Sequence, residues 1–255
     1  MDPTGIPKSS VQRYAKKNKI KHYKTHLVHG LLEDDPDRRL EFCSKIIEKT
    51  DVDSKWHEGI VFLDEATFYR TGTVNRHNCH YYNTKNPHIL QEEKLKSTGI
   101  TVWAAVTKDG VLSYDISRQT MTGERYASVL SNHIVPHLSQ PEMKDVFFQQ
   151  DGAPPHYANV AKAVLDQNLP NRWIGRGSSF MDWPPRSPDL TVCDFFLWGF
   201  LKEKVYCHNI ATDDELMRLI EEELLLIPRE LFSKAYDCFL FRCHQCIAID
   251  GNQFE

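Results

Sequence analysis

The sequence has no apolar run that approaches the roughly 20 residues needed for a membrane-spanning helix, so no membrane partner is predicted. It has no internal repeat and no low-complexity segment, and its basic N-terminal stretch lacks the apolar region of a secretory signal. Seven cysteines, an odd number without secretory context, predict reduced thiols inside a cell. The 255 residues, 41% hydrophobic and 26% charged, are typical of a soluble globular protein with one main domain.

The net charge of −4 hides a basic arm, defined here as residues 1–30. The arm has one acid, Asp2, and seven basic residues: Lys8, Arg13, Lys16, Lys17, Lys19, Lys21 and Lys24. Its net charge is therefore +6, and the rest of the chain carries −10. Such an arm is a natural contact for a polyanion, but a solvated tail has the same composition, so charge alone does not choose between them.

Hydrophobic periodicity and capping signals predict the order of the elements. Helices are expected over 9–24 and 34–50, a buried strand over 60–64, a hairpin over 99–117 that turns at Asp109-Gly110, a helix over 122–138, a strand over 145–151, a helix over 158–169, a short strand over 172–175, and helices over 193–206, 213–227 and 229–249. This is the order of an RNase H-like α/β domain. We expect a mixed sheet flanked by helices, with a short helical N-terminal remnant and a helical C-terminus.

Three carboxylates occupy marked places in this order. Asp64 and Asp151 follow buried apolar runs, each at the expected end of a strand, and Asp194 lies in the first turn of a helix. If the two strands are neighbours, their terminal carboxylates converge and the helix brings in the third. Three carboxylates so close repel one another, and divalent cations resolve that conflict. Mg²⁺ or Mn²⁺ prefers such oxygen ligands, and two ions about 3.5 to 4 Å apart support phosphoryl transfer.

Each of these carboxylates also has a simpler interpretation. A single aspartate at a strand end is usually a turn residue, and Asp194 could be only a helix cap. Asp182 and Asp189 are rival ligands in the preceding loop, although the turn formed by Ser187, Pro188 and Asp189 gives Asp189 a local role. Glu65, next to Asp64, should face the other side of its strand because side chains alternate.

Other candidate residues have structural interpretations that we favour. Cys243 and Cys246 form a CxxC pair with Cys238 nearby, but no second pair accompanies them and they lie in a helical pattern, so we expect thiols of the core or surface rather than a zinc site. Trp183 and Trp198 could stack on bases, but the spacing of Trp198 predicts a core residue.

Three stretches, "FLDEATF", "FFQQDGAPPHY" and "WPPRSPDLTVCDFFLWG", resemble in sequence and order the three catalytic motifs of mariner-type DDE transposases, which are RNase H-like enzymes that cut and paste DNA. The resemblance covers roughly residues 9 to 255. It implies that Asp64, Asp151 and Asp194 are the catalytic and metal-binding triad, with aspartate rather than glutamate in third place. His156 matches a motif residue near the site, whose role stays open.

The N-terminal residues resemble a second part of the same family. "SSVQRYAKKNKIKHYK" is similar to the end of its second helix-turn-helix, and "HLVHGLLEDD" to the linker that helps to pair transposase subunits. The resemblance implies an N-terminally truncated chain: residues 1–32 as a remnant of the DNA-binding region plus linker, and 33–255 as the catalytic domain with C-terminal helices. It also implies a homodimer through the linker. The expected DNA contacts are Arg13, Lys16, Lys17, Lys19, Lys21 and Lys24.

The sequence therefore predicts a DNA endonuclease and strand transferase that uses two Mg²⁺ or Mn²⁺ ions on the aspartate triad and acts on double-stranded DNA, both transposon ends and target DNA, in the nucleus. One alternative is a degenerate or host-adopted transposon product that binds DNA or protein without cutting. Another is an RNase H-type nuclease acting on RNA, which would leave the helix-turn-helix remnant unexplained.

Overall fold

The computed structural model describes residues 8–18, 30–70 and 99–254. Its centre is a five-stranded sheet of order β3-β2-β1-β4-β5. The strands are β1 (Ile60–Phe68), β2 (Ile100–Thr107), β3 (Gly110–Ser117), β4 (Phe147–Gln150) and β5 (Trp173–Ile174). β1, β2 and β3 pair antiparallel, whereas β1, β4 and β5 pair parallel, so the sheet is mixed, as predicted.

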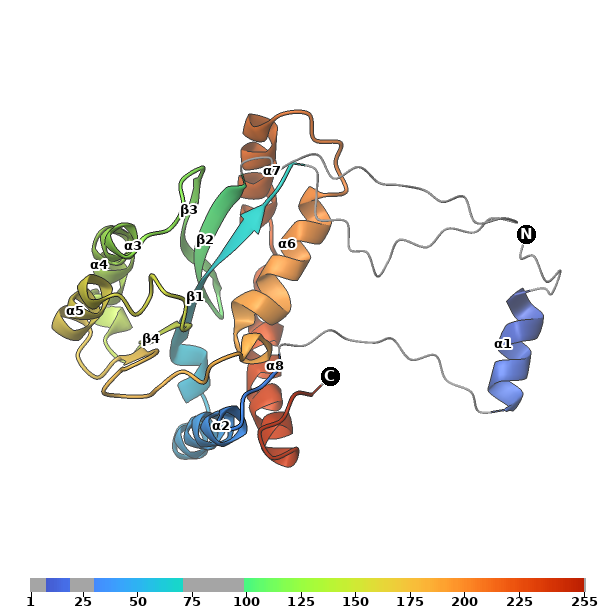
Figure 1. The fold of residues 1–255 in the computed structure, drawn as a ribbon, viewed down its shortest axis with the longest axis horizontal. Coiled ribbons are helices and arrows are strands. Elements are labelled where there is room, and N and C mark those ends of the chain that lie inside the picture. The colour runs from blue at the N-terminus through green and yellow to red at the C-terminus, as the bar shows by residue number, and fades with distance from the viewer. Residues whose placement is uncertain (1–7, 19–29, 71–98, 255) are drawn as a thin grey trace.

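Helices cover both faces of the sheet (Figure 1). One face packs against α2 (Asp35–Val52), α6 (Trp198–Val205), α7 (Asp213–Leu225) and α8 (Arg229–Ala248), and the other against α3 (Gly123–Val129), α4 (Val135–Leu138) and α5 (Asn159–Asn168). The remaining α-helix in the described part of the chain is α1 (Lys8–Lys17). None of the described helices combines the length and the apolar character that crossing a bilayer requires.

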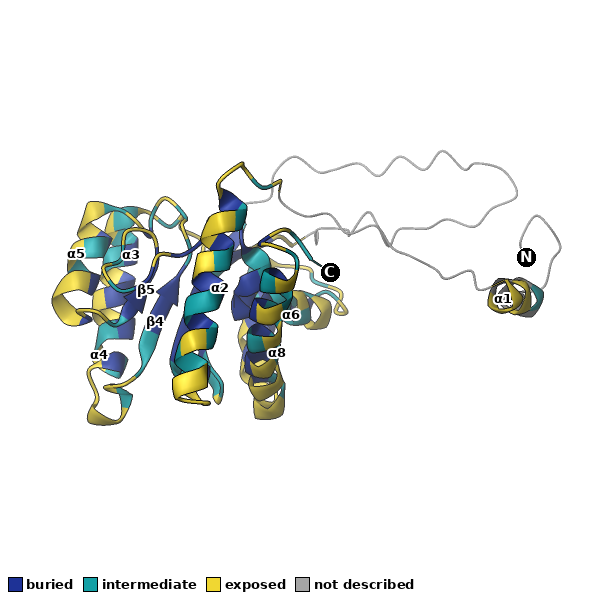
Figure 2. Ribbon diagram, turned by 90° about the horizontal axis from the view of Figure 1, so that it is seen from below, coloured by how far each residue is buried: buried dark blue, intermediate teal, exposed yellow. Residues whose placement is uncertain are grey.

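The first strand is buried on both faces because its apolar run supplies both cores. Ile60 and Phe62 point into the cluster on the α8 side, and Val61 and Leu63 into the cluster on the α3 side. All four are at most 1% exposed, and Figure 2 shows the buried sheet between the two helical layers. The predicted central strand is thus confirmed.

The predicted hairpin and helix caps are also present. Gly110 adopts φ +139° where β2 turns into β3, a conformation that few other residues take. Thr122 caps α3 and Thr212 caps α7, each by accepting a hydrogen bond from a backbone N–H in the first turn. The helix predicted over 122–138 is continuous but contains a π-helical turn, η2 (Leu130–Ile134), between α3 and α4.

The position of Asp64 corrects the prediction that it ends its strand. β1 continues to Phe68, because the residues after Asp64 keep pairing with β2 as far as the Phe68–Ile100 pair. What ends at this point is the parallel ladder with β4, whose last pair is Leu63 with Gln150. Asp64 therefore lies inside β1, and Asp151 is the first residue beyond β4.

The helix predicted over 9–24 is α1, which ends at Lys17. The side-chain amide of Asn18 donates to the Tyr14 carbonyl at 2.8 Å, at the end of α1. The predicted continuation over 19–24 lies outside the described residues.

A buried arginine holds α2 to the loop that precedes α6. Arg39 is fully buried, and its guanidinium donates to both carboxylate oxygens of Asp189, at 2.7 and 2.5 Å, and to the Ser187 hydroxyl at 2.8 Å. It also donates to the carbonyls of Gly251 at 2.8 Å and Asn252 at 3.3 Å. One side chain thus joins α2, the loop and the C-terminal segment.

Replacing Arg39 by methionine should lower the free energy of unfolding by about 3 to 5 kcal/mol, because it leaves the largely buried Asp189 carboxylate and several acceptors without their donor. Its neighbour Arg38 is the control: it is exposed and its partner among the described residues is the exposed Asp34, so Arg38→Met should cost about 0.5 kcal/mol or less. Urea unfolding measures both. Equal losses of unfolding free energy in the two variants would contradict a stabilising role for the buried Arg39–Asp189 pair.

Candidate active site

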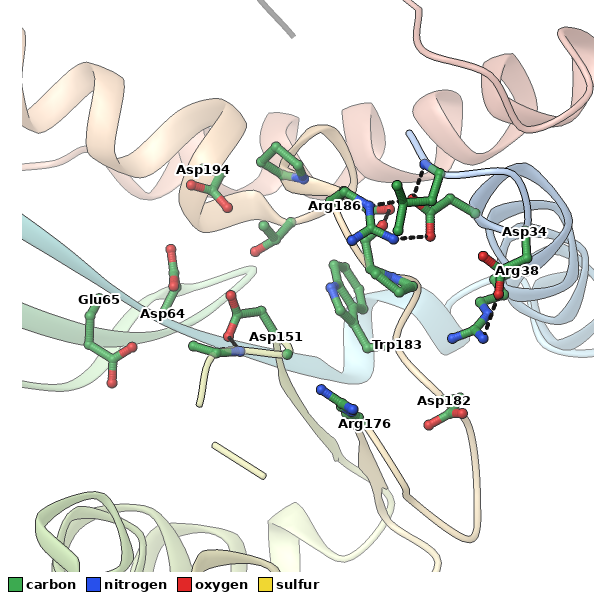
Figure 3. Close-up of a pocket in the computed structure, with 18 residues that line it drawn as sticks. Asp34, Arg38, Asp64, Glu65, Asp151, Arg176, Asp182, Trp183, Arg186 and Asp194 are labelled. Carbon is green, nitrogen blue, oxygen red and sulfur yellow. Dashed lines mark hydrogen bonds and ion pairs between the residues drawn. The ribbon is translucent and has the colours of Figure 1, made fainter. Parts of the chain in front are cut away.

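A cleft of about 750 Å³ opens where the β1–β4 ladder ends. Its walls come from β1, the turn after β4, the loop before α6 and the start of α2 (Figure 3). Acidic side chains outnumber basic ones around it. The acidic lining residues are Asp34, Asp35, Asp64, Glu65, Asp151, Asp182 and Asp194, and the basic ones are Arg38, Arg176 and Arg186. The three predicted triad residues are therefore brought to one cleft from three separate elements.

Asp64 is buried on the floor of this cleft at 8% exposure. The indole N–H of Trp198, from α6, donates to its Oδ2 at 2.8 Å. Burial raises the pKa of Asp64 well above its ordinary value, and the charges of Asp194 and Asp151 raise it further, with the Trp198 hydrogen bond opposing them. An ionised Asp64 is thus disfavoured unless a cation is near.

Asp151 is held from its own turn. Its Oδ1 accepts the backbone N–H of Ala153 at 2.9 Å and a short hydrogen bond from Nδ1 of His156. Burial by itself would raise the pKa of Asp151, but the hydrogen bond and charge of His156 outweigh it and lower the pKa below the usual aspartate value. Of the three aspartates, Asp151 is the one whose pKa is lowered, so its ionised form is favoured without a metal.

Asp194 enters from the π-helical turn η5 (Cys193–Leu197) that leads into α6. Asp194 is exposed to solvent and lines the cleft together with Asp64 and Asp151. Desolvation by the surrounding protein, followed by the charge of Asp151, raises the pKa of Asp194 to about 7, although Lys202 opposes the shift. Figure 3 shows Asp64, Asp151 and Asp194 facing the same space.

His156 is buried beside the triad, and sequence reasoning left its role open. Its Nε2 lies 2.8 Å from Oε2 of Glu65, while Nδ1 contacts Asp151. Burial opposes a charged ring, but the carboxylates of Glu65 and Asp151 outweigh it and raise the pKa of His156 to about 10. The other oxygen of Glu65, Oε1, is buried and has no hydrogen-bond partner among the described residues.

The prediction that Glu65 faces away from Asp64 is confirmed by their contacts. Asp64 meets Trp198 on one side of β1, and Glu65 meets His156 on the other. Both nevertheless line the cleft, because the sheet narrows where β4 stops.

The rival aspartates have structural partners. Asp189 is the counterion of Arg39, and Asp182 accepts the backbone N–H of Gly177 at 2.6 Å. The fully buried Asp35, which the sequence did not single out, is paired with Arg186. Because Asp189 is bound to Arg39 and Asp182 to a backbone N–H, Asp194 is the remaining candidate for the third carboxylate of the predicted triad.

Basic side chains near the triad were missed by the sequence reasoning. Lys202 lies close enough to Asp194 and Asp64 for their charges to raise its pKa. Burial has the larger effect, so the pKa of Lys202 is lowered overall. Arg176 stacks on Tyr157, its guanidinium carbon 4.2 Å from the ring centroid, and lines the cleft. Helical spacing is a signal for Trp198 and Lys202, since both follow Asp194 at multiples of four residues.

Divalent cations fit this donor set. The donors are carboxylate oxygens. Burial and then neighbouring carboxylates raise the pKa values of Asp64 and Asp194, and a buried oxygen of Glu65 has no donor among the described residues. No group of three or more Asp, Glu, His or Cys side chains in the described residues already has the spacing of metal ligands. The carboxylates therefore line the same cleft, but in the described structure they do not converge on a single metal position.

The other candidate residues lie as follows. Cys243 and Cys246 are buried in the core, and Cys238 is partly buried, as expected for free thiols. Trp198 is 5% exposed, which confirms it as a core residue, and Trp183 packs edge-on against Phe42.

The basic arm is only partly described. Arg13, Lys16 and Lys17 are exposed on α1, and Lys19, Lys21 and Lys24 lie outside the described residues.

Comparison with solved structures identifies the fold. The crystal structure of the mariner Mos1 paired-end complex with Mg superposes with a TM-score of 0.77 at 20% identity, covering 98% of this chain and 72% of that one. The Mos1 transposase catalytic domain with raltegravir and Mn gives 0.67 at 20% identity, covering 89% and 100%. No family model and no curated protein matches the sequence.

The mixed sheet between two helical layers, with acidic residues where the parallel ladder ends, defines an RNase H-like fold. Within that class, the chain has the fold of the mariner Mos1 transposase catalytic domain.

Replacing Asp194 by asparagine should stabilise the metal-free protein at pH 8. Because folding raises the pKa of Asp194 from 3.8 to about 7, the folded state binds more protons between these values, and stability falls as the pH rises through this window. After the reduction for solvent screening, the free energy of unfolding should rise by about 1 kcal/mol, which corresponds to a few degrees in Tm. The gain should vanish near pH 4. Thermal unfolding in EDTA measures it.

Asp182→Asn is the matched control. It removes a charge from the opposite wall of the same cleft and keeps an oxygen for the Gly177 N–H, so no comparable gain is expected. A gain for Asp194→Asn that is equally large at pH 4 would contradict the electrostatic explanation.

Proposed function

We propose that this chain is a transposase-type DNA endonuclease and strand transferase of the mariner kind. Its metal ligands would be Asp64, Asp151 and Asp194, holding two Mg²⁺ or Mn²⁺ ions. The observation that carries the proposal is the convergence of these carboxylates on one cleft, from β1, from the end of β4 and from the turn before α6. The shifted pKa values of Asp64 and Asp194 support it, since they describe a site short of positive charge.

The side chains around the triad have defined parts in such a reaction. Trp198 fixes one oxygen of Asp64, and the Ala153 N–H fixes one oxygen of Asp151, so each carboxylate keeps its other oxygen for the cleft. Arg176 and Lys202 supply positive charge for a phosphodiester backbone. Bound divalent ions would activate a water or a 3′-hydroxyl for attack on phosphorus and neutralise the leaving oxygen.

The fold comparison supports the same substrate class. The similar structures include a Mos1 transposase paired-end complex with the left transposon end and a Mos1 strand transfer complex, and the Mos1 catalytic domain was solved with Mn and with Mg. In those proteins, this fold works on DNA ends in assemblies. For this chain we propose double-stranded DNA, as transposon ends and as target, for a reaction in the nucleus.

The N-terminal residues would extend the DNA contact. We propose that residues 1–32 act as a DNA-binding segment and linker to a catalytic domain over 33–255, and that two copies pair through the linker. The exposed Arg13, Lys16 and Lys17 on α1 support a contact with the phosphate backbone.

The test is nicking of supercoiled DNA by the purified chain with Mn²⁺. The parent should nick, and Asp151→Asn should not, because it removes one charge of the triad while the protein keeps its fold. The variant Asp182→Asn, on the opposite wall of the cleft, should nick like the parent, which separates loss of a ligand from loss of any acidic group.

Nicking that survives in Asp151→Asn would show a contaminating nuclease or another site. Absence of nicking by the folded parent would contradict autonomous catalysis and favour the alternative, a transposon-derived protein that binds DNA or protein without cutting.

A further inference from the structure

His156 bridges two carboxylates on the wall of the cleft. Its side chain is fully buried, with Nδ1 on Oδ1 of Asp151 and Nε2 at 2.8 Å from Oε2 of Glu65. Since an ionised carboxylate only accepts hydrogen bonds, both ring nitrogens donate. The bridge joins Glu65, in β1, to Asp151, in the turn after β4, and these two residues are far apart in the sequence.

The imidazole ring is held in a fixed orientation by its surroundings. Its face lies against Tyr126, with ring centroids 4.3 Å apart. The backbone carbonyl of His156 accepts the side-chain amide of Gln150 at 2.8 Å, and its N–H donates to the Ala153 carbonyl at 2.9 Å. The hydroxyl of Tyr126 in turn donates to Oε1 of Gln150 at 2.8 Å. A ring packed and anchored in this way has little freedom to swing away from its carboxylates.

The bridge uses one oxygen of each carboxylate and leaves the other without a hydrogen bond among the described residues. Both hydrogen bonds of Asp151 go to Oδ1, and none to Oδ2 is found among the described residues. On Glu65, Oε2 meets the imidazole, while Oε1 is buried and has no hydrogen-bond partner in the described structure. A buried carboxylate oxygen without a partner is costly, so a donor or cation is expected beside it.

We propose that His156 is a positioning residue that holds Asp151 and Glu65 with one oxygen each left for the cation-binding cleft, and that Glu65 supplies a fourth carboxylate to this site. The inference rests on the proposed function. It goes beyond the aspartate triad, because it assigns a role to a glutamate that faces the opposite side of β1 from Asp64.

Two substitutions separate the two arms of the bridge. In His156→Asn, the amide nitrogen occupies roughly the place of Nδ1 and can still donate to Asp151. In His156→Gln, it occupies roughly the place of Nε2 and can donate only to Glu65. The measurement is the affinity for Mn²⁺, from the electron paramagnetic resonance signal of free Mn²⁺, with circular dichroism to verify folding.

If His156 positions Asp151, His156→Gln should weaken Mn²⁺ binding by about 10- to 100-fold, and His156→Asn should bind several-fold more tightly than His156→Gln. Equal weakening by both variants would mean that the hydrogen bond kept to Asp151 in His156→Asn gives no advantage, which would contradict the positioning of Asp151. Binding like the parent in both would mean that the bridge has no bearing on the cation.

Glu65→Gln tests the fourth carboxylate with a side chain of the same shape, and serves if the histidine variants do not fold. It should weaken Mn²⁺ binding by about 10-fold or more. Binding equal to that of the parent would contradict a direct role for Glu65.

The variant Asp194→Asn tests the proposed function without changing the bridge, because Asp194 has no hydrogen bond to the bridge among the described residues. If the parent binds no Mn²⁺, the proposed function and the inference are both wrong. If Asp194→Asn weakens binding but the His156 and Glu65 variants do not, only the inference is wrong.

Discussion

The parallel pairing of β1 with β4 is the constraint on which the site depends. The ladder ends at the Leu63–Gln150 pair, so the next residues of the two strands, Asp64 and Asp151, lie side by side where the sheet narrows. The burial of β1 on both faces fixes this register, since a shift of one residue would turn its apolar side chains to the wrong cores. Two carboxylates are thereby held together regardless of the repulsion between them.

The protein offsets that repulsion unevenly. His156 compensates Asp151 and Glu65, and lowers the pKa of Asp151 despite burial. Asp64 receives a hydrogen bond from the neutral Trp198 indole, and Asp194 has Lys202 nearby, but burial and the neighbouring carboxylates outweigh both and raise the pKa values of the two aspartates. The charge that is missing lies between the three aspartates, where the proposed divalent ions would bind. Stability given up in the metal-free protein would then be recovered on binding.

Local sequence patterns predicted the parts of the site that depend on a few neighbouring residues. The apolar runs before Asp64 and Asp151 and the helical spacing after Asp194 placed the triad on the right elements. The extension of β1 beyond Asp64 depends on pairing with β2, which no local pattern encodes. The hydrogen bond from His156 to Glu65 joins residues 91 positions apart, and the ion pair of Arg39 with Asp189 joins residues 150 positions apart. Such contacts follow from the assembled fold, so the sequence alone could not predict which carboxylates His156 contacts.

We propose that Asp64, Asp151 and Asp194 together hold divalent metal. Anomalous diffraction from crystals of the chain grown with Mn²⁺ tests it most directly, because manganese is located without reference to activity. If the three aspartates are the ligands, anomalous peaks should lie in the cleft within coordination distance of all three carboxylates. Peaks elsewhere, or a cleft without manganese under saturating Mn²⁺, would contradict it.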